Sequence, residues 1–151
     1  MLPIERILCP TDFSDPSYEG LKGAIELAEH FSAELMLVHI VSPIPAMAGA
    51  AAPTGFHIPA VLEEMEVRAV EMLEVVKTEK VSKSIKTQTM VIHGKPADQI
   101  VRTAEEEKAD IIVIATHGQS GWQRFISGSV TERVVRMASC PVLAVPAPHE
   151  D

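Results

Sequence analysis

The stretch ADIIVIATHGQSGWQRFISGSV, residues 109–130, decides the expected fold. It begins with residues 111–114, a run of β-branched side chains that is typical of a strand covered on both faces in a parallel sheet. A glycine-bearing loop follows, and apolar residues at helical spacing begin at Val130. A strand, a glycine-bearing loop and a helix start, in this order, are typical of sites that bind phosphate groups. The stretch therefore predicts an α/β fold with a ligand site beyond this strand.

Gly128 and Ser129 stand at the predicted start of the helix. We expect Ser129 in the first turn or at the cap, where backbone N–H groups lack partners and the helix dipole supplies about half a positive charge. Gly118, Gly121 and Gly128 allow a ligand to approach the main chain closely, because glycine has no Cβ. Backbone donors at this position predict a site for an anion.

Two general phosphate motifs are absent. A P-loop has lysine before its final Ser or Thr, whereas Ser127 precedes Gly128-Ser129, and the dinucleotide fingerprint GxGxxG does not occur. The chain has Ala115-x-x-Gly118, then nine residues, then Gly128-Ser129. This pattern resembles the G-x2-G-x9-G-[S/T] signature of the universal stress protein family, in its ATP-binding branch. Ala115 stands where the family motif has glycine.

Further matches extend the resemblance over nearly the whole chain. PTDFS at residues 10–14 and PVLAV at residues 141–145 occupy the family's positions near the two ends. Short elements such as PTDF are weak evidence when taken singly. Their order, together with the nine-residue spacing, is specific.

Composition limits the class of protein. A chain of 151 residues with 46% hydrophobic residues fits one domain over residues 1–151, large enough to bury a core without metal or disulfide bonds. The formal net charge of −8 argues against a nucleic-acid surface. No apolar run has membrane-spanning length and no signal peptide is indicated, so we expect a cytoplasmic protein without a membrane anchor. Cys9 and Cys140 are expected to be buried, reduced thiols.

Hydrophobic periodicity predicts the order βαβ, a long loop, then αβαβαβ. Parallel neighbours need crossover connections, so we expect one open, five-stranded parallel sheet with helices on both faces, a Rossmann-like α/β fold. Met65 and Met72 of the predicted helix at residues 60–81 are expected to fill the core. The expected strands are residues 6–9, 34–40, 85–93, 111–114 and 142–145.

Two segments are expected to lack regular structure. Residues 42–59 are rich in proline, glycine and alanine, and we interpret them as a mobile flap beside the ligand site or as disorder without a function. Residues 146–151 form the expected tail.

Asp12 follows the first predicted strand and has two interpretations. It can cap the next helix, or it can bind a ligand at the carboxyl edge of the sheet. The resemblance implies the second role, in which the aspartate reaches the ribose and adenine region of a nucleotide. It also implies that the backbone of Ile40 contacts adenine, whereas His39 is interpreted as a packed histidine because no metal-ligating partner stands nearby.

The resemblance implies that the chain binds ATP, with Mg²⁺ held by the phosphates and no dedicated protein cage. A methyl group at Ala115 is expected to narrow the space for ribose or phosphate. The predicted nucleotide-binding residues are Pro10, Thr11, Asp12, Ile40, Ile114, Ala115, Thr116, His117, Gly118, Gly128, Ser129 and Val130.

The expected function is that of an ATP-binding regulatory or protective module in the stress response. An alternative is an enzyme such as a slow ATP hydrolase, but His117 and Asp12 are the only candidate bases in the predicted loops, so we expect no efficient turnover. Another alternative is a dimeric interaction protein of the same family that binds no nucleotide. We also expect a homodimer joined through the last strand, Val142, Leu143, Ala144 and Val145, as is common in the family.

Overall fold

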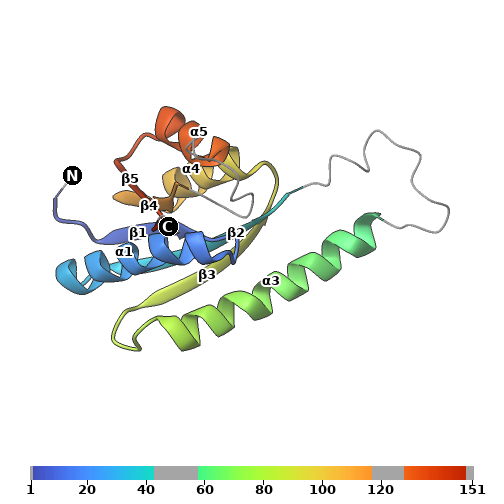
Figure 1. Cartoon of the computed structure of the whole chain (residues 1–151), viewed down its shortest axis with the longest axis horizontal. Coiled ribbons are helices and arrows are strands. Elements are labelled where there is room, and N and C mark those ends of the chain that lie inside the picture. The colour runs from blue at the N-terminus through green and yellow to red at the C-terminus, as the bar shows by residue number, and fades with distance from the viewer. Residues whose placement is uncertain (1, 43–57, 117–127, 149–151) are drawn as a thin grey trace.

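A computed structural model of the chain describes residues 2–42, 58–116 and 128–148. Within these ranges strands and helices alternate along the chain (Figure 1). The predicted strands are confirmed to within two residues at each end. The elements are β1 (Arg6–Pro10), α1 (Asp15–Phe31), β2 (Glu34–Val41), α3 (Ile58–Lys80), β3 (Thr87–His93), α4 (Pro96–Glu106), β4 (Ile111–Ala115), α5 (Ser129–Met137) and β5 (Val142–Val145).

The strands form one five-stranded parallel sheet in the order β3-β2-β1-β4-β5. β1 therefore lies between β2 and β4, and Ile7 pairs with Ile111 in the register of β1 and β4. Strand order reverses between β1 and β4, which is where ligands bind in open α/β sheets. This adjacency brings the segments that follow β1 and β4 to the same edge of the sheet.

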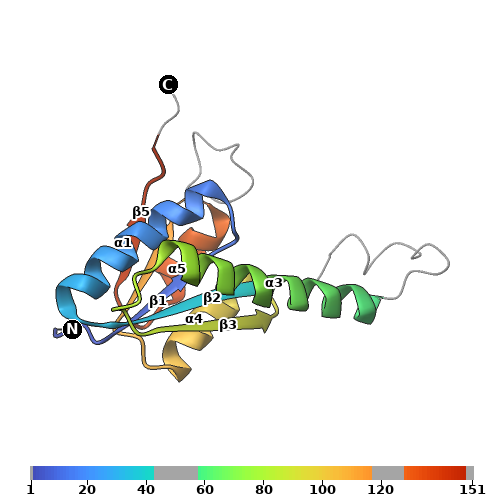
Figure 2. The same ribbon diagram turned by 90° about the horizontal axis from the view of Figure 1, so that it is seen from below.

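Two hydrophobic layers hold the helices to the sheet (Figure 2). α1 and α3 cover one face, where Leu21 and Leu73 pack with Ile7. α4 and α5 cover the other face, where Ile100 and Val134 pack with other strand residues. Because both faces are covered, the buried positions of the central strands are apolar, as the run at residues 111–114 predicts.

α1 begins and ends at residues suited to those positions. Ser14 caps its N-terminus and accepts a hydrogen bond from the Ser17 N–H. Pro16 lies in the first turn, where its missing N–H costs no helical hydrogen bond. Gly20 lies against the end of β4, because a Cβ there would come within 2.9 Å of the Ala115 nitrogen. The N-terminal part of α1 therefore lies against the carboxyl end of β4.

α3 differs from the prediction in two respects. It begins at Ile58, inside the segment expected to be a loop, and the helix accommodates Pro59 because it lies in the first turn. Met65 and Met72, expected in the core, are each 38% exposed, so that expectation is wrong for them. The N-terminal half of α3 extends beyond the sheet (Figure 1), and burial begins only at Ala69.

The remaining predictions of irregular structure concern residues 43–57 and 149–151, which lie outside the described residues. Among the helices that the structure describes, none combines the length and the apolar composition needed to cross a membrane.

Candidate functional site

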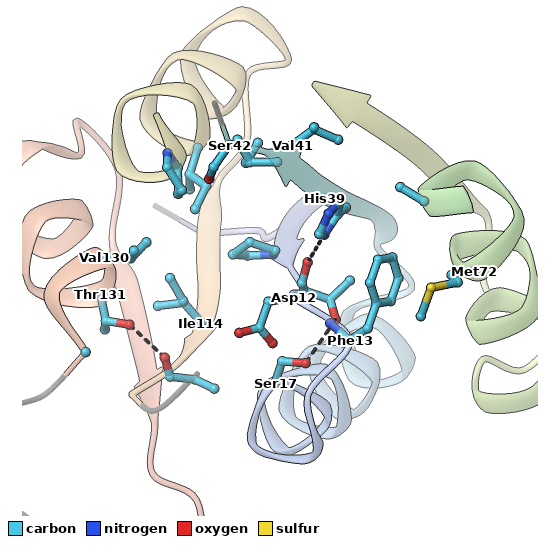
Figure 3. A pocket seen from close by; sticks show the side chains of 18 of the residues that line it. Asp12, Phe13, Ser17, His39, Val41, Ser42, Met72, Ile114, Val130 and Thr131 are labelled. Carbon is cyan, nitrogen blue, oxygen red and sulfur yellow. Dashed lines mark hydrogen bonds between the residues drawn. The ribbon is translucent and has the colours of Figure 1, made fainter. Parts of the chain in front are cut away.

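A cavity of about 670 Å³ opens at the carboxyl edge of the sheet (Figure 3). Its walls come from the ends of β1, β2 and β4, from the start of α5 and from α3. Two segments more than a hundred residues apart in sequence, the loop after β1 and the first turn of α5, therefore face one space. The predicted site residues that line it are Pro10, Thr11, Asp12, Ile40, Ile114, Ala115, Gly128, Ser129 and Val130.

Of the three other predicted residues, the structure describes only Thr116, which does not line the cavity. Thr116 directly follows β4. Its N–H donates to the Val145 carbonyl at 2.9 Å, and its carbonyl accepts from the Gly128 N–H at 2.6 Å. His117 and Gly118 lie outside the described residues. Their place in the site stays a prediction.

The loop after β1 is held in a compact conformation. The Thr11 side-chain hydroxyl accepts from the Phe13 N–H at 3.1 Å, and Phe13 has a left-handed φ of 65°. Asp12 Oδ1 accepts from the Ser14 N–H at 3.0 Å, and also from the Ser14 hydroxyl. Asp12 therefore supports the start of α1 and also lines the cavity, so the two interpretations of this residue are compatible.

His39 lies half-buried on β2, and its ring is in contact with the loop after β1. Its Nδ1 is 2.8 Å from the Thr11 carbonyl oxygen, and its ring centroid is 4.6 Å from that of Phe13. Figure 3 shows the imidazole beside Phe13 on the α3 side of the cavity. The expectation of a packed histidine is confirmed, but the residue also lines the site.

The first turn of α5 faces the cavity and carries no side-chain cap. Gly128 is the N-cap, and α5 begins at Ser129, as the sequence predicts. The N–H groups of the first turn have no acceptor within a helix, and the positive end of the dipole lies here. Ser129, Val130 and Thr131 line the cavity, so this helix end can receive an anion from that space.

Glycine at position 128 is required by a close approach. Its φ is −42°, which any residue adopts, so a left-handed conformation is not the reason. A Cβ at this position would come within 2.9 Å of the Thr116 carbonyl oxygen. Gly128 therefore lets the start of α5 lie against the end of β4.

The methyl group of Ala115 packs toward α1. It lies on the α1 side of β4, where a Cβ on Gly20 would be 3.5 Å from the Ala115 Cβ. Ala115 also lines the cavity, so the effect of this methyl on the space for ribose or phosphate stays a prediction. A small residue is needed here because α1 approaches β4 closely.

The cavity is also lined by residues that were not predicted to belong to the site. Met65, Arg68 and Met72 recur on one face of α3. Met65 and Met72 were expected in the core, because the pattern does not reveal where the sheet ends. Thr131 comes two residues after the Gly128-Ser129 motif. The additional residues are Phe13, Ser17, His39, Val41, Ser42, Met65, Arg68, Ala69, Met72, Pro96, Ile100 and Thr131.

The charged and nucleophilic groups near the cavity limit its chemistry. The Arg68 guanidinium is 3.6 Å from the Glu64 carboxylate, and both side chains are exposed. Cys9 is fully buried, and burial raises its thiol pKa to about 12, so it is not a nucleophile at neutral pH. Cys140 precedes β5, at the opposite edge of the sheet from the cavity; it is half-buried, and burial raises its thiol pKa as well. Within the described ranges, no group of three His, Cys, Asp or Glu side chains is arranged to hold a metal ion.

Comparison with known proteins identifies the family. The model of the universal stress protein family matches residues 3–146. The chain belongs to this family. Universal stress protein MJ0531 of Methanocaldococcus jannaschii is 38% identical over 147 residues, which cover 97% of this chain and 85% of that protein. Universal stress protein MJ0577 of the same organism is 28% identical over 152 residues, covering 93% of this chain and 94% of that protein.

Solved structures of universal stress proteins share the fold. The structure of MJ0577 superposes with a TM-score of 0.83 at 27% identity, covering 97% of this chain and 99% of that chain. A universal stress protein from Archaeoglobus fulgidus, solved in complex with dAMP, superposes with a TM-score of 0.60 at 22% identity, covering 96% of this chain and 99% of that chain.

Proposed function

We propose that this universal stress protein binds ATP in the cavity and acts as a nucleotide-dependent regulatory or protective module in the stress response. The observation that carries the proposal is the uncapped N-terminus of α5, which lines the same cavity as Asp12. An anion-binding helix end opposite a carboxylate suits a ligand with phosphate at one end and sugar hydroxyls at the other. A nucleotide has both groups.

The residues present can hold the parts of a nucleotide. First-turn N–H groups of α5 would donate to phosphate oxygens, and the Ser129 hydroxyl would add a donor. The Asp12 carboxylate would accept from ribose hydroxyls, with the backbone of Thr11 and Ile40 near the base. The loop residues His117 and Gly118 would complete the phosphate site. Mg²⁺ would neutralise phosphate charge and be held by the phosphates themselves.

The comparisons support the class of ligand. A protein of the same family and fold has been solved with a bound adenine nucleotide, dAMP. Family membership and the shared pattern from Ala115 to Ser129 favour the ATP-binding branch over the branch that binds no nucleotide. We propose that residues 1–151 form one such domain.

We also propose that the protein is a homodimer joined through β5. β5 lies at an edge of the sheet, and Leu143 on it is 40% exposed. An edge strand with unpaired backbone groups can pair with its own copy about a twofold axis. This is the arrangement common in the family.

A thermal-shift experiment tests the proposed ligand. A ligand selective for the native state raises the melting temperature, so Mg-ATP at millimolar concentration is expected to stabilise the parent protein. Gly128→Val is expected to remove this shift, because its side chain meets the Thr116 carbonyl and displaces the first turn of α5. An unshifted melting temperature of the parent protein in Mg-ATP would contradict the proposal.

Gly23→Ala is the matched control for that experiment. It also adds a side chain at a tightly packed glycine, since its Cβ would lie 3.3 Å from Val145 Cγ2. Gly23 does not line the cavity, so this variant is expected to keep the full ATP shift even if its own stability falls. Loss of the shift in Gly23→Ala as well would show that the Gly128 result reports general destabilisation.

A further inference from the structure

At the carboxyl end of β1 and β2, a side chain takes the place of the last backbone hydrogen bond between the two strands. The Glu34 N–H donates to the Glu5 carbonyl at 2.8 Å, and the Thr11 N–H donates to the Val38 carbonyl at 2.9 Å. Even-numbered residues of β2 therefore direct their backbone groups toward β1. By this alternation, the N–H that would pair with the Thr11 carbonyl is that of Ile40.

The structure shows a different donor at this carbonyl. The Thr11 oxygen is 2.8 Å from His39 Nδ1. Since a carbonyl oxygen only accepts, Nδ1 is the protonated nitrogen. Among the hydrogen bonds of the described residues, none joins the Ile40 N–H to the Thr11 carbonyl. The imidazole therefore takes the acceptor that the ladder would give to Ile40.

The geometry points to His39 as a positioning residue that keeps the Ile40 N–H available to the ligand. Ile40 lines the cavity where β1 has ended, so an N–H withheld from the ladder faces the ligand space. The same hydrogen bond fixes Thr11, and Thr11 in turn bonds to Phe13 in the loop that carries Asp12. This role rests on the proposed function, since the ligand it serves is the nucleotide bound beside Ile40.

Two contacts of His39 can be separated by substitution. His39→Phe retains an aromatic ring to pack against Phe13, 4.6 Å away between centroids, but has no donor. His39→Asn has no ring but carries an N–H donor at the position of Nδ1. If the hydrogen-bond donor matters, His39→Asn retains the ATP affinity that His39→Phe loses. His39→Leu serves as a second donor-free variant if His39→Phe does not fold.

Titration calorimetry with Mg-ATP measures the effect on the site. His39→Phe is expected to bind ATP about tenfold more weakly than the parent, the loss of roughly one hydrogen bond and of loop order. His39→Asn is expected to bind within about threefold of the parent. Equal binding by the parent and His39→Phe, or equal weakening by both variants, would overturn the role of the donor.

Amide hydrogen exchange tests the same inference without nucleotide. In the ligand-free parent, the Ile40 N–H is expected to exchange faster than the Val38 N–H of the same strand. In His39→Phe the Thr11 carbonyl is released and can accept from Ile40, so exchange at Ile40 is expected to slow, whereas general loosening of the site would speed it. Faster exchange at Ile40 in that variant, or an Ile40 amide as protected as Val38 in the parent, would overturn the inference. A parent that binds no ATP but shows the expected exchange pattern would instead refute the proposed ligand alone.

Discussion

The choice of residue at position 115 depends on its contact with α1. The family motif has glycine at this position, and the sequence predicts that the methyl group of Ala115 narrows the space for ribose or phosphate. In the structure the side chain of Ala115 lies on the α1 side of β4, next to Gly20. Gly20 belongs to no motif. Because it has no side chain, it leaves space on α1 for the Ala115 methyl group. The packing of α1 against β4 therefore accommodates alanine in place of the motif glycine.

Ala115→Gly is expected to leave ATP binding within about threefold of the parent, because the lost methyl is on the α1 side. The same change is expected to lower the free energy of unfolding by about 1 kcal/mol, since glycine has greater conformational freedom in the unfolded chain. Calorimetry and urea denaturation measure the two quantities. Markedly weaker ATP binding with unchanged stability would show that the methyl group contacts the ligand after all.

The contact between α5 and β4 positions the helix start that forms the proposed anion site. Thr131 is 4% exposed, and its hydroxyl donates to the Ala115 carbonyl at 2.7 Å. The Gly128 N–H donates to the Thr116 carbonyl at 2.6 Å. These two bonds join the first turn of α5 to the last residues of β4 and fix where the free N–H groups lie.

Thr131→Val is expected to destabilise the protein by about 1–2 kcal/mol, because valine has nearly the shape of threonine but leaves the buried Ala115 carbonyl without this donor. ATP affinity is expected to fall as well, since the first turn of α5 is less firmly placed. Thr131→Ser keeps the hydroxyl and is the control for the hydrogen bond. If Thr131→Val and Thr131→Ser are equally stable, this bond does not secure the helix start.

The sequence predicted the elements better than the contacts between them. The run at residues 111–114 and the helix start at Gly128-Ser129 are local signals, so strand and helix assignments followed from them. The cavity face of α3 could not be predicted, because Met65 and Met72 have the spacing of core residues and only the tertiary structure shows that the helix extends past the sheet. Likewise, the hydrogen bond of His39 to Thr11 depends on strand register, which periodicity does not give.

At the scale of the whole molecule, β5 leaves one edge of the sheet open. The Ile112 N–H donates to the Pro141 carbonyl at 3.0 Å and the Thr116 N–H to the Val145 carbonyl at 2.9 Å. Odd-numbered residues of β5 therefore direct their backbone groups toward β4. The backbone groups of Val142 and Ala144 point to the open edge, where a second copy would pair.

Ala144→Pro is accordingly expected to shift the proposed dimer toward monomer, because it removes an outward donor and spares the bonds to β4. Ala144→Thr keeps the N–H and is expected to remain dimeric. Light scattering at tens of micromolar protein measures the masses, with circular dichroism to check the fold. A parent that is monomeric at this concentration would refute the dimer.

The central claim is that the cavity between the loop after β1 and the start of α5 holds one adenine nucleotide in each chain. Calorimetric titration of nucleotide-stripped protein with Mg-ATP measures this directly. The account predicts saturable binding with a stoichiometry of about one per chain in the parent, and loss of that binding in folded Gly128→Val. Absence of saturable binding in the parent, or unaltered binding in folded Gly128→Val, would contradict it.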